Sequence, residues 1–525
     1  MPYDYQEIPF VTPKPLREGA SVEKLGVAIV GAGPIGLALA IDLAQRGVAS
    51  VVFDDNNVVS VGSRAICWAK RTLEILDRLG VADRMVEKGV GWKVGRTFHG
   101  DREVWNFDLL PEDGHKMPAF INLQQFYVEE YLIERARAFP DLIDLRFLNR
   151  VEGVTREGRA EVRTPEGDYA IEADWIVACD GAKSPIRAGL GLELEGEGFE
   201  ERFLIADVTL GADFPAERRF WFEPTFHEGQ SALLHKQADG SYRIDLQLGR
   251  EADAEAEKRP EVVIPRLKKV FGETPFELDW VSVYTFQCRM LDRFVHGRVI
   301  FCGDSAHVVS PFGARGGNGG LQDVDNLGWK LAAMLGGAPE ALLASYEVER
   351  IHGARENLMN SSRSTRFMSP DPGAERLFRD EVLKLAGAAP FARSMVNSGR
   401  LSRPCAYEDG PLNGPDSDLP AGARPGAPCP DAPLTDPAGG ESWLLNALGA
   451  GFTLLSLGGE AALEGAETLS ILDPGPALRA RYLGGAPSAV YLIRPDQHVA
   501  ARWRVWDARQ GAAALARAQG RGGAT

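Results

Sequence analysis

Short apolar runs that lead into glycine or aspartate recur along much of this chain. Val27–Val30 is a β-branched run that leads directly into the sequence GAGPIG at Gly31–Gly36. Leu37–Gln45 then shows helical periodicity, and Val51–Phe53 is a second apolar run. Continuous apolar runs of this length are typical of parallel strands that are buried on both faces. The pattern predicts a strand, a glycine turn, a helix and a second strand.

This unit has the properties of a dinucleotide site. Gly31 permits the tight turn, Gly33 lets the backbone approach a pyrophosphate, and Gly36 allows the helix to pack closely on the strand. The N-terminus of the helix offers unpaired N–H groups to the phosphates. Asp54, which follows the second strand together with Asp55, is placed to accept hydrogen bonds from a ribose. The unit alone does not distinguish FAD from NAD.

Two further apolar runs also lead into a glycine and an acidic residue. Trp175–Cys179 is followed by Asp180–Gly181, and Val299–Cys302 is followed by Gly303–Asp304. A glycine and an acidic residue at a strand end can approach a nucleotide closely. We therefore expect two more strands whose carboxyl ends reach the same site.

A glycine-rich stretch, Pro311–Gly320, precedes a helical pattern that begins near Leu321. A loop of this composition can press its backbone N–H groups against a flat ring. The N-terminus of the following helix would stabilise negative charge on that ring. This loop is therefore expected to hold the reactive part of a cofactor.

The pattern changes between Gly191 and Arg289, where polar and apolar positions alternate. Alternation of this kind predicts an antiparallel sheet, which would cover the cofactor ring. The expected strands are Phe203–Val208, Arg219–Phe222, Ser231–Lys236, Tyr242–Leu248 and Trp280–Phe286. In the fourth strand the apolar side chains share one face, and Arg243, Asp245 and Gln247 share the other. The alternation does not show which face is turned inward.

The remainder of the chain predicts helices, a linker and a small domain. Ala341–Leu385 has a largely helical pattern, and Gly399–Gly440 is rich in proline, glycine and aspartate, as expected of an irregular linker. Short apolar runs then predict strands at Phe452–Leu457, Ser470–Leu472 and Ala489–Ile493. The small and basic residues at Ala512–Thr525 are expected to be partly disordered.

Composition excludes several classes of partner. The chain has 525 residues, which indicates two or three domains, and its net charge is −16. The absence of a basic tract argues against nucleic acid or a membrane surface as a partner. The six cysteines show neither a C-x-x-C pair nor the spacing of metal ligands, so no metal is expected. An acidic, polar N-terminus and the lack of a membrane-spanning pattern predict a cytoplasmic location.

Several motifs together resemble the class A flavoprotein monooxygenases, the single-component aromatic hydroxylases of the p-hydroxybenzoate hydroxylase and phenol hydroxylase type. The resemblance covers roughly residues 25–365, and the stretch WFEPTFHEGQSALLHKQ resembles the 3-(3-hydroxyphenyl)propionate hydroxylase-like subgroup. The motifs that carry it are GAGPIG, the Ser63–Ala65 segment followed by RTLEILDRLG, CDGAKSPIR, GDSAH and PFGARGGNGGLQDVDNLGWKLA.

The resemblance implies an FAD site. Asp304 would bond the ribityl hydroxyls, Pro311 would lie near the reactive edge of the ring, and Asn318 is a candidate for direct ring contact. Arg64 and Gln125 match positions that contact FAD in the family. The full expected set is Gly31, Gly33, Pro34, Ile35, Gly36, Asp54, Asp55, Arg64, Gln125, Asp180, Gly181, Gly303, Asp304, Pro311, Gly316, Gly317, Asn318 and Gly320.

The resemblance also implies a reaction. NADH or NADPH would reduce FAD, O2 would form a flavin C4a-hydroperoxide, and its distal oxygen would attack a phenolic ring. The aromatic substrate itself is not identified. The catalytic candidates are a polar cluster and two groups near the ring: His235, Arg243, Asp245, Gln247, Tyr284 and Pro311.

The expected fold combines α/β and α+β architecture: a Rossmann-like FAD domain, an inserted antiparallel substrate sheet and a thioredoxin-like C-terminal domain. The chain is expected to form a homodimer. The expected boundaries are 1–24 for an N-terminal extension, 25–195 and 291–398 for the FAD domain with a helical segment, 196–290 for the substrate sheet, 399–440 for the linker and 441–525 for the C-terminal domain, which lacks C-x-x-C.

Other flavin chemistry is less well supported. A halogenase would carry a G-W-x-W-x-I-P motif, which GWKVG at Gly91–Gly95 does not match. A disulfide reductase would need a redox cysteine pair near the first helix, and Cys67 has no such neighbour in the sequence. A dehydrogenase and a non-catalytic FAD-binding protein remain open alternatives.

Overall fold

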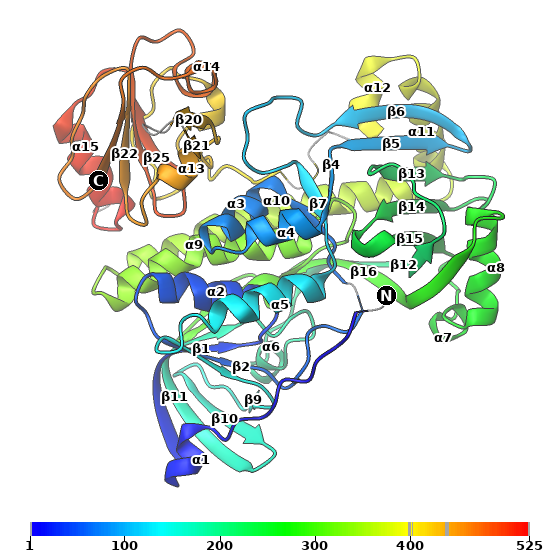
Figure 1. Cartoon of the computed structure of the whole chain (residues 1–525), viewed down its shortest axis with the longest axis horizontal. Coiled ribbons are helices and arrows are strands. Elements are labelled where there is room, and N and C mark those ends of the chain that lie inside the picture. Colours follow the sequence, from blue (N-terminus) through cyan, green and yellow to red (C-terminus); the bar gives the residue numbers. More distant parts are fainter. Residues whose placement is uncertain (1–2, 63, 397–400, 402, 436–439, 523–525) are drawn as a thin grey trace.

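The computed structural model describes the chain except for residues 1–2, 63, 397–400, 402, 436–439 and 523–525. Figure 1 shows a layered α/β part, a twisted antiparallel sheet beside it, and a small C-terminal domain. Strands from widely separated segments of the chain contribute to each of the first two parts. Neither part is therefore a continuous piece of sequence.

The α/β part is built on a mostly parallel sheet. Its strands are β1 (Val22–Val30), β2 (Ser50–Phe53), β8 (Ile143–Arg146), β9 (Arg150–Glu152), β10 (Arg159–Thr164), β11 (Gly167–Ala178), β17 (Val295–His296) and β18 (Val299–Phe301). The strand order is β17-β18-β11-β1-β2-β8, and β1 pairs in parallel with both β2 and β11. Strands β9 and β10 extend the sheet from the first half of β11. The predicted buried strands are thus confirmed.

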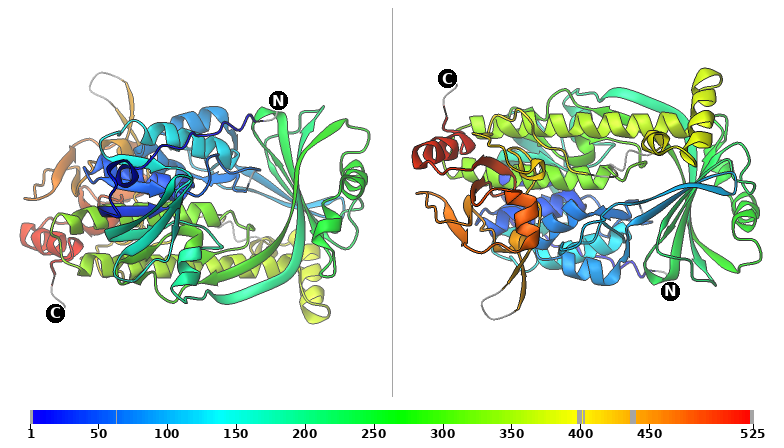
Figure 2. Two further views of the ribbon diagram at one scale, coloured as in Figure 1. Left: turned by 90° about the horizontal axis from the view of Figure 1, so that it is seen from below. Right: turned by 90° about the horizontal axis from the view of Figure 1, so that it is seen from above.

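Helices cover this sheet. A small three-stranded sheet beside it joins it to the rest of the molecule. The helices are α1 (Lys14–Glu18), α2 (Pro34–Gln45), α3 (Lys70–Arg78), α4 (Ala82–Lys88), α5 (Gln125–Ala136), α6 (Pro185–Gly189), α9 (Gly316–Leu335) and α10 (Ala341–Met368). The small sheet has the order β3-β7-β4, with β3 (Cys67–Ala69), β4 (Val90–Trp92) and β7 (Phe120–Asn122). In Figure 2, α10 runs from the C-terminal domain to the second sheet.

The second sheet has the strand order β19-β16-β12-β15-β14-β13-β5-β6. Its strands are β5 (Val94–His99), β6 (Arg102–Asp108), β12 (Glu195–Leu210), β13 (Arg218–Phe222), β14 (Ser231–Lys236), β15 (Ser241–Leu248), β16 (Phe276–Met290) and β19 (His307–Val308). One face packs on α8 (Pro260–Phe271), beside the short α7 (Ala254–Glu257). All five predicted strands are present, and the apolar face of β15 is the one that packs on α8.

Strands β5 and β6 correct the expected domain boundaries. The segment 25–195 was expected to belong entirely to the nucleotide-binding part, yet β5 and β6 extend the second sheet. Strand β5 pairs in parallel with β13, which lies more than a hundred residues later in the chain. A parallel pairing across this distance has no local turn signal, so the alternation pattern alone could not assign it.

The C-terminal region contains helices and a separate small sheet. Helices α11 (Ala374–Ala386) and α12 (Pro390–Val396) follow α10, and the C-terminal elements are β20 (Pro433–Thr435), β21 (Glu441–Trp443), α13 (Leu444–Ala447), β22 (Thr453–Leu457), β23 (Glu467–Ile471), α14 (Pro476–Leu478), β24 (Ala489–Ile493), β25 (Val499–Trp503) and α15 (Ala508–Ala518). The sheet order is β23-β22-β24-β25. The expected disorder after Ala512 is wrong as far as Ala518, because Ala514, Leu515 and Ala518 pack α15 on this sheet.

Two features, a membrane-spanning helix and a cluster of metal ligands, are absent from the described residues. Across these residues, no helix combines the length and apolar character needed to cross a membrane. Histidine, cysteine, aspartate and glutamate side chains also form no group there that could hold a metal ion.

We predict that Gly328→Ala destabilises the α/β part. Gly328 lies where α9 crosses α2, and an added Cβ would lie within 3.0 Å of the buried Asp42 carboxylate. Overpacking of this kind costs about 1–3 kcal/mol of unfolding free energy, so the apparent Tm should fall by several degrees. Gly189→Ala is the control, since its Cβ would meet no described atom within 4 Å. Equal Tm values for the two variants would contradict the predicted packing.

Candidate functional site

The glycine turn after β1 packs against the end of β11. Gly31 has a φ of +109°, and an added Cβ would lie within 3.0 Å of the Cys179 carbonyl oxygen. Gly36 is equally restricted, because its Cβ would overlap the carbonyl oxygen of Gly31. At Gly33, by contrast, no described atom lies within 4 Å of an added Cβ. The turn is thus closed toward the sheet and open at the position expected to face a pyrophosphate.

Asp54 lies beside this turn at the end of β2. Its Oδ2 accepts a hydrogen bond of 2.7 Å from the Ala32 backbone N–H, and its Oδ1 accepts one of 2.9 Å from Asn56. Burial raises the pKa of the Asp54 carboxyl. Asp55 is exposed and accepts a hydrogen bond from the Asn56 side chain. Of the two acids, only Asp54 is in contact with the glycine turn.

Asp180 caps a short helix at the end of β11. Its Oδ2 accepts hydrogen bonds from the Ser184 hydroxyl at 2.7 Å and from the Ile186 N–H at 3.2 Å. Its Oδ1 is buried without a partner among the described residues, and burial raises the pKa of this carboxyl. Gly181 follows with a φ of +78°. The turn is connected to the next motif because Arg187 donates a 3.0 Å hydrogen bond to the Ser305 carbonyl.

Asp304 lies in the turn that follows β18, close to the start of α9. Burial raises the pKa of the Asp304 carboxyl, and the nearby charges of His307 and Arg64 oppose that shift. The Asp304 side chain nevertheless keeps exposed surface. Across the described chain it has no hydrogen-bond partner. An added Cβ on Gly316, the first residue of α9, would lie 3.9 Å from Asp304 Oδ1. Asp304, Arg64 and the N-terminus of α9 therefore surround the same space.

Helix α9 begins at Gly316, five residues before the predicted start. Its glycines allow close packing, because an added Cβ on Gly317 would lie 3.3 Å from the Trp68 ring, and one on Gly320 would lie 2.6 Å from Ile35 Cδ1. Ile35 also packs under Gly303, so one side chain of α2 contacts both later motifs. Pro34 occupies the first turn of α2, where its missing N–H costs no hydrogen bond. Pro311 is exposed, and its carbonyl accepts the hydrogen bond of a turn that precedes α9.

Asn318 and Gln125, two residues expected to contact FAD, have side chains that bind other parts of the protein. The Asn318 amide donates to the Cys67 and Ala314 carbonyls and accepts from the Ala69 N–H, so it joins α9 to β3. The expected contact between Asn318 and the ring would have to come from its backbone, because each polar atom of its amide has a backbone partner. Gln125 accepts from the Ala65 N–H and thereby supports the loop that carries Arg64.

The polar face of the second sheet contacts the loop that carries Arg64. Arg243 forms a double ion pair with Asp207, at 2.8 and 2.9 Å, and donates a 3.1 Å hydrogen bond to the Arg64 carbonyl. His235 lies directly across from Arg243 in the sheet, and its Nδ1 is 4.0 Å from the Cys67 sulfur. Burial, with help from positive charge nearby, lowers the pKa of His235 well below its usual value. The histidine is therefore neutral near pH 7.

Asp245 and Arg218 are charged groups on this face that lack hydrogen bonds to the described residues. Burial raises the pKa of Asp245 to about 6, although Arg243 and Arg218 oppose the shift, and its Oδ1 is unpartnered. The Arg218 Nε is likewise buried without a partner. Both side chains keep partial exposure within the protein. Sequence reasoning missed Arg218, although it sits next to the predicted strand on the same face as Phe220.

Gln247 does not belong to the predicted cluster. Its amide oxygen accepts from the Ser231 N–H, and its nitrogen donates to Glu201 and Ser369. These partners hold it at the other end of the polar face, so its assignment to the cluster is wrong.

Aromatic side chains fill the space beyond the polar groups. Tyr284 lies opposite Phe203 on neighbouring strands. Phe312, next to Pro311, contacts the same group, with its ring centroid 4.9 Å from that of Phe203 and 5.0 Å from that of Phe286. The site therefore combines a polar end near Cys67 with an aromatic end near Pro311. Period-2 alternation marks these strand residues but does not identify their partners from other segments.

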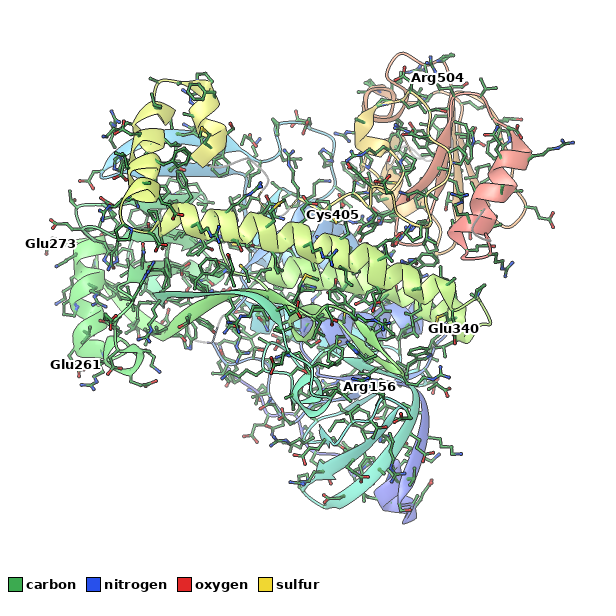
Figure 3. All side chains as sticks on the ribbon, turned by 180° about the vertical axis from the view of Figure 1, so that it is seen from behind. Arg156, Glu261, Glu273, Glu340, Cys405 and Arg504 are labelled. Carbon is green, nitrogen blue, oxygen red and sulfur yellow. The ribbon has the colours of Figure 1, made fainter. Side chains whose placement is uncertain are left out.

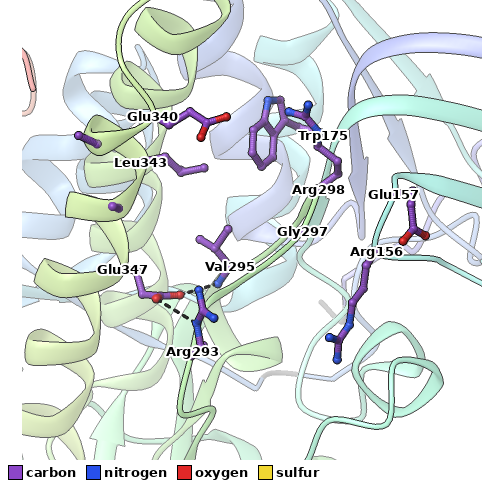
Figure 4. A pocket seen from close by; sticks show the side chains of 12 residues that line it. Arg156, Glu157, Trp175, Arg293, Val295, Gly297, Arg298, Glu340, Leu343 and Glu347 are labelled. Atoms are coloured by element: carbon purple, nitrogen blue, oxygen red, sulfur yellow. Dashed lines mark hydrogen bonds and ion pairs between the residues drawn. The ribbon is translucent and has the colours of Figure 1, made fainter.

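A pocket of about 720 Å³ lies elsewhere, between the sheet and α10. Figure 4 shows Arg298 beside the Trp175 ring and Glu347 bound to Arg293. Its lining residue Gly297 precedes β18, whereas Gly303 and Asp304 follow that strand. Ligands of open α/β sheets bind at the carboxyl ends of the strands. The geometry therefore favours the edge of the sheet at Gly303 and Asp304 as the functional site.

Comparison with known proteins identifies the family of the chain. A family model described as FAD binding domain matches residues 24–361. The chain is 30% identical to a flavin-dependent monooxygenase of Mycobacteroides abscessus, over 90% of this chain and 96% of that protein. It is 31% identical to a probable NADH-specific resorcinol 4-hydroxylase of Rhodococcus jostii, over 63% of each chain.

Solved structures share the fold. The flavin-dependent monooxygenase PieE, solved with FAD and substrate, superposes with a TM-score of 0.79 at 23% identity, over 95% of this chain and 99% of that one. The p-nitrophenol 4-monooxygenase of Pseudomonas putida superposes with a TM-score of 0.64 at 26% identity, over 73% of this chain and all of that one.

We predict that Asp304→Ala weakens FAD binding without lowering the Tm of the FAD-free protein. The Asp304 carboxylate has no hydrogen bond to the described residues, and burial raises its pKa, so its removal should leave the Tm of the FAD-free protein unchanged or higher. Loss of hydrogen bonds from FAD hydroxyls to a charged acceptor should weaken FAD binding by about 10- to 150-fold. Fluorescence titration of the FAD-free protein measures the Kd for FAD of both variants. Unchanged FAD affinity would contradict this placement. Asp141→Ala serves as the control, because Asp141 is exposed and precedes β8, at the amino ends of the parallel strands.

Proposed function

The chain belongs to the FAD binding domain family and is a flavin-dependent monooxygenase, and from this premise we propose that it hydroxylates a phenolic ring using O2 and NADH or NADPH. The observation that carries the proposal is the position of the second sheet. Its polar face contacts the loop that carries Arg64, and its aromatic face packs on Phe312, which precedes α9. A cofactor ring and an aromatic substrate could therefore lie against each other there.

The residues around Asp304 and the start of α9 fit FAD. The open backbone at Gly33 would receive the pyrophosphate, Asp54 the ribose, and Asp304 the ribityl chain, while N–H groups of Gly316 and Gly317 would face the ring. Bound FAD supplies the reduction by NAD(P)H and the activation of O2. Further residues proposed to contact FAD or shape its site are Gly31, Pro34, Ile35, Gly36, Asp55, Arg64, Gln125, Asp180, Gly181, Gly303, Pro311 and Gly320, and Asn318 through its backbone.

Asp245 is the proposed acceptor of the phenolic proton. Removal of that proton increases the electron density of the ring at the ortho and para carbons. An enclosed carboxylate with a pKa of about 6 is ionised at neutral pH and still basic enough to accept a proton. Arg218 would stabilise the phenolate that results, since its guanidinium lacks a described partner. His235 and Arg243 complete the polar end, and Arg243 also fixes the loop that carries Arg64.

The aromatic end is proposed to position the ring and exclude water. Phe203, Phe286 and Phe312 are buried, and Tyr284 packs with them. Planar walls of this kind hold an aromatic substrate with little conformational freedom. Pro311 lies next to Phe312 and would face the reactive edge of the cofactor. The phenolic substrates named for the relatives, including resorcinol and 3-(3-hydroxyphenyl)propionate, support a phenol as the substrate class.

A cytoplasmic homodimer is also part of the proposal. Exposed apolar side chains on α11 and α12, among them Leu377, Phe378 and Phe391, would support a contact between subunits. Sedimentation equilibrium should then give twice the chain mass of 57.1 kDa. The need for NADH or NADPH supports a cytoplasmic location.

We predict substrate-stimulated NAD(P)H oxidation with incorporation of one oxygen atom. A panel of phenols and phenolic acids under ¹⁸O2 should give a product heavier by one labelled oxygen, detected by mass spectrometry. Phenols should be hydroxylated in preference to their methyl ethers, which have no proton to donate to Asp245. Peroxide release without a labelled product for every phenol would identify an oxidase instead, and the absence of NAD(P)H oxidation would favour a non-catalytic FAD-binding protein.

The pH dependence of kcat/KM should follow the ionisation of the Asp245 carboxyl. Its pKa is raised from 3.8 to about 6, so below pH 6 the carboxyl is protonated and kcat/KM should fall about tenfold per pH unit. Asp245→Asn should remove this dependence and lower kcat/KM above pH 7 by about 10²- to 10⁴-fold. Asp279→Asn, on an exposed position of the same sheet, is the control. An acidic limb that persists in the Asp245→Asn variant would exclude Asp245 as the base.

A further inference from the structure

One buried arginine connects the two segments proposed to bind the ribityl chain and the flavin ring. Arg350 of α10 donates from Nε to Asp323 at 2.5 Å and from one terminal nitrogen to the Gly319 carbonyl at 3.3 Å. Asp323 also accepts from the Gly303 N–H at 2.9 Å and from His307 at 2.7 Å. The Arg350–Asp323 pair thus bonds to the loop that carries Asp304 and to the first turn of α9.

The segment leading into the C-terminal domain supplies the remaining partner of Arg350. The other terminal nitrogen of Arg350 donates a 3.0 Å hydrogen bond to the Tyr407 hydroxyl. Tyr407 is buried, and its ring stacks on His498 with centroids 4.8 Å apart. Figure 3 shows Cys405, two residues earlier, beside the long helix α10. An added Cβ on Gly353 of that helix would lie 3.1 Å from the Cys405 sulfur.

The turn that contains His498 is itself bound to three helices of the α/β part. Arg494 pairs with Glu349 of α10 at 2.6 and 2.9 Å, and Glu349 also binds Lys330 of α9 at 2.7 Å. Arg71 of α3 donates to the Asp496 carbonyl at 2.7 Å. All of these side chains are buried. Because a buried charge without its partner is strongly destabilising, this contact fixes the position of the turn.

We infer that the C-terminal domain is a positioning part of the FAD site, acting through Tyr407. Tyr407 satisfies the last terminal nitrogen of Arg350, and Arg350 keeps Asp323 bound to the Gly303 loop and α9 near its start. This inference rests on the proposed placement of FAD between Asp304 and α9. It gives the domain a role that needs no redox cysteine pair. Without the Tyr407 hydroxyl, a buried N–H of Arg350 loses its acceptor, and the guanidinium would shift toward another partner.

Tyr407→Phe tests this role by removal of a single oxygen atom. We expect the Kd for FAD to rise about five- to tenfold, measured by fluorescence titration of the FAD-free protein. The near-UV and visible circular dichroism of bound FAD should also change, because the two segments around the ring would shift. Tyr482→Phe is the matched control. Its hydroxyl is buried in the C-terminal domain and donates to the Pro430 carbonyl at 2.5 Å, and Arg350 is not its partner.

A second variant and the wild-type protein distinguish a failure of this inference from a failure of the proposed FAD placement. His498→Gln removes the ring stacked on Tyr407 without touching Arg350, and it should raise the Kd for FAD by a smaller factor than Tyr407→Phe. If FAD affinity in both variants equals that of Tyr482→Phe, the inference is overturned while FAD binding stands. If the wild-type protein binds FAD but Asp304→Ala binds it equally well, the proposed FAD placement fails instead.

Discussion

The structure depends on the convergence of parallel strand ends at one edge of a sheet. Strands β1, β11 and β18 lie side by side, so the turns that follow them must meet. Contact between Gly31 and the Cys179 carbonyl is so close that a side chain cannot fit there. Three segments that are far apart in sequence therefore meet, and the residues proposed to bind FAD come from the turns rather than from one continuous motif.

The second sheet is asymmetric for a physical reason. One face buries an apolar cluster against α8, which supplies the favourable free energy of burial. The other face carries Asp207, Arg243, Asp245 and Arg218 in enclosed positions, which costs free energy unless each charge has a partner. Asp207 and Arg243 form an ion pair with each other. Asp245 and Arg218, by contrast, have no hydrogen-bond partner among the described residues. Unsatisfied charges on a site-facing surface are the feature expected of groups that bind a substrate.

Sequence reasoning was reliable where a local pattern determines the structure. The glycine turn, the buried strands and the apolar face of β15 each follow from nearby residues, and all were predicted. Partners from distant segments were not predictable, because no local pattern shows that Asn318 bonds to β3 or that Gln247 bonds to Ser369. Arg218 was missed for a related reason: its neighbour Cys67 approaches from a separate segment of the chain.

The pairing of β5 with β13 has a consequence for how this protein is made. Residues Val94–Asp108 leave the ribosome well before their partner strand, since β13 begins only at Arg218. At a synthesis rate of about 5–20 residues per second, the hairpin waits roughly 5 to 20 seconds for its partner. During this interval its edge is unpaired and open to other strands. Production of the enzyme should therefore depend on chaperone supply and translation speed more than its final stability would suggest.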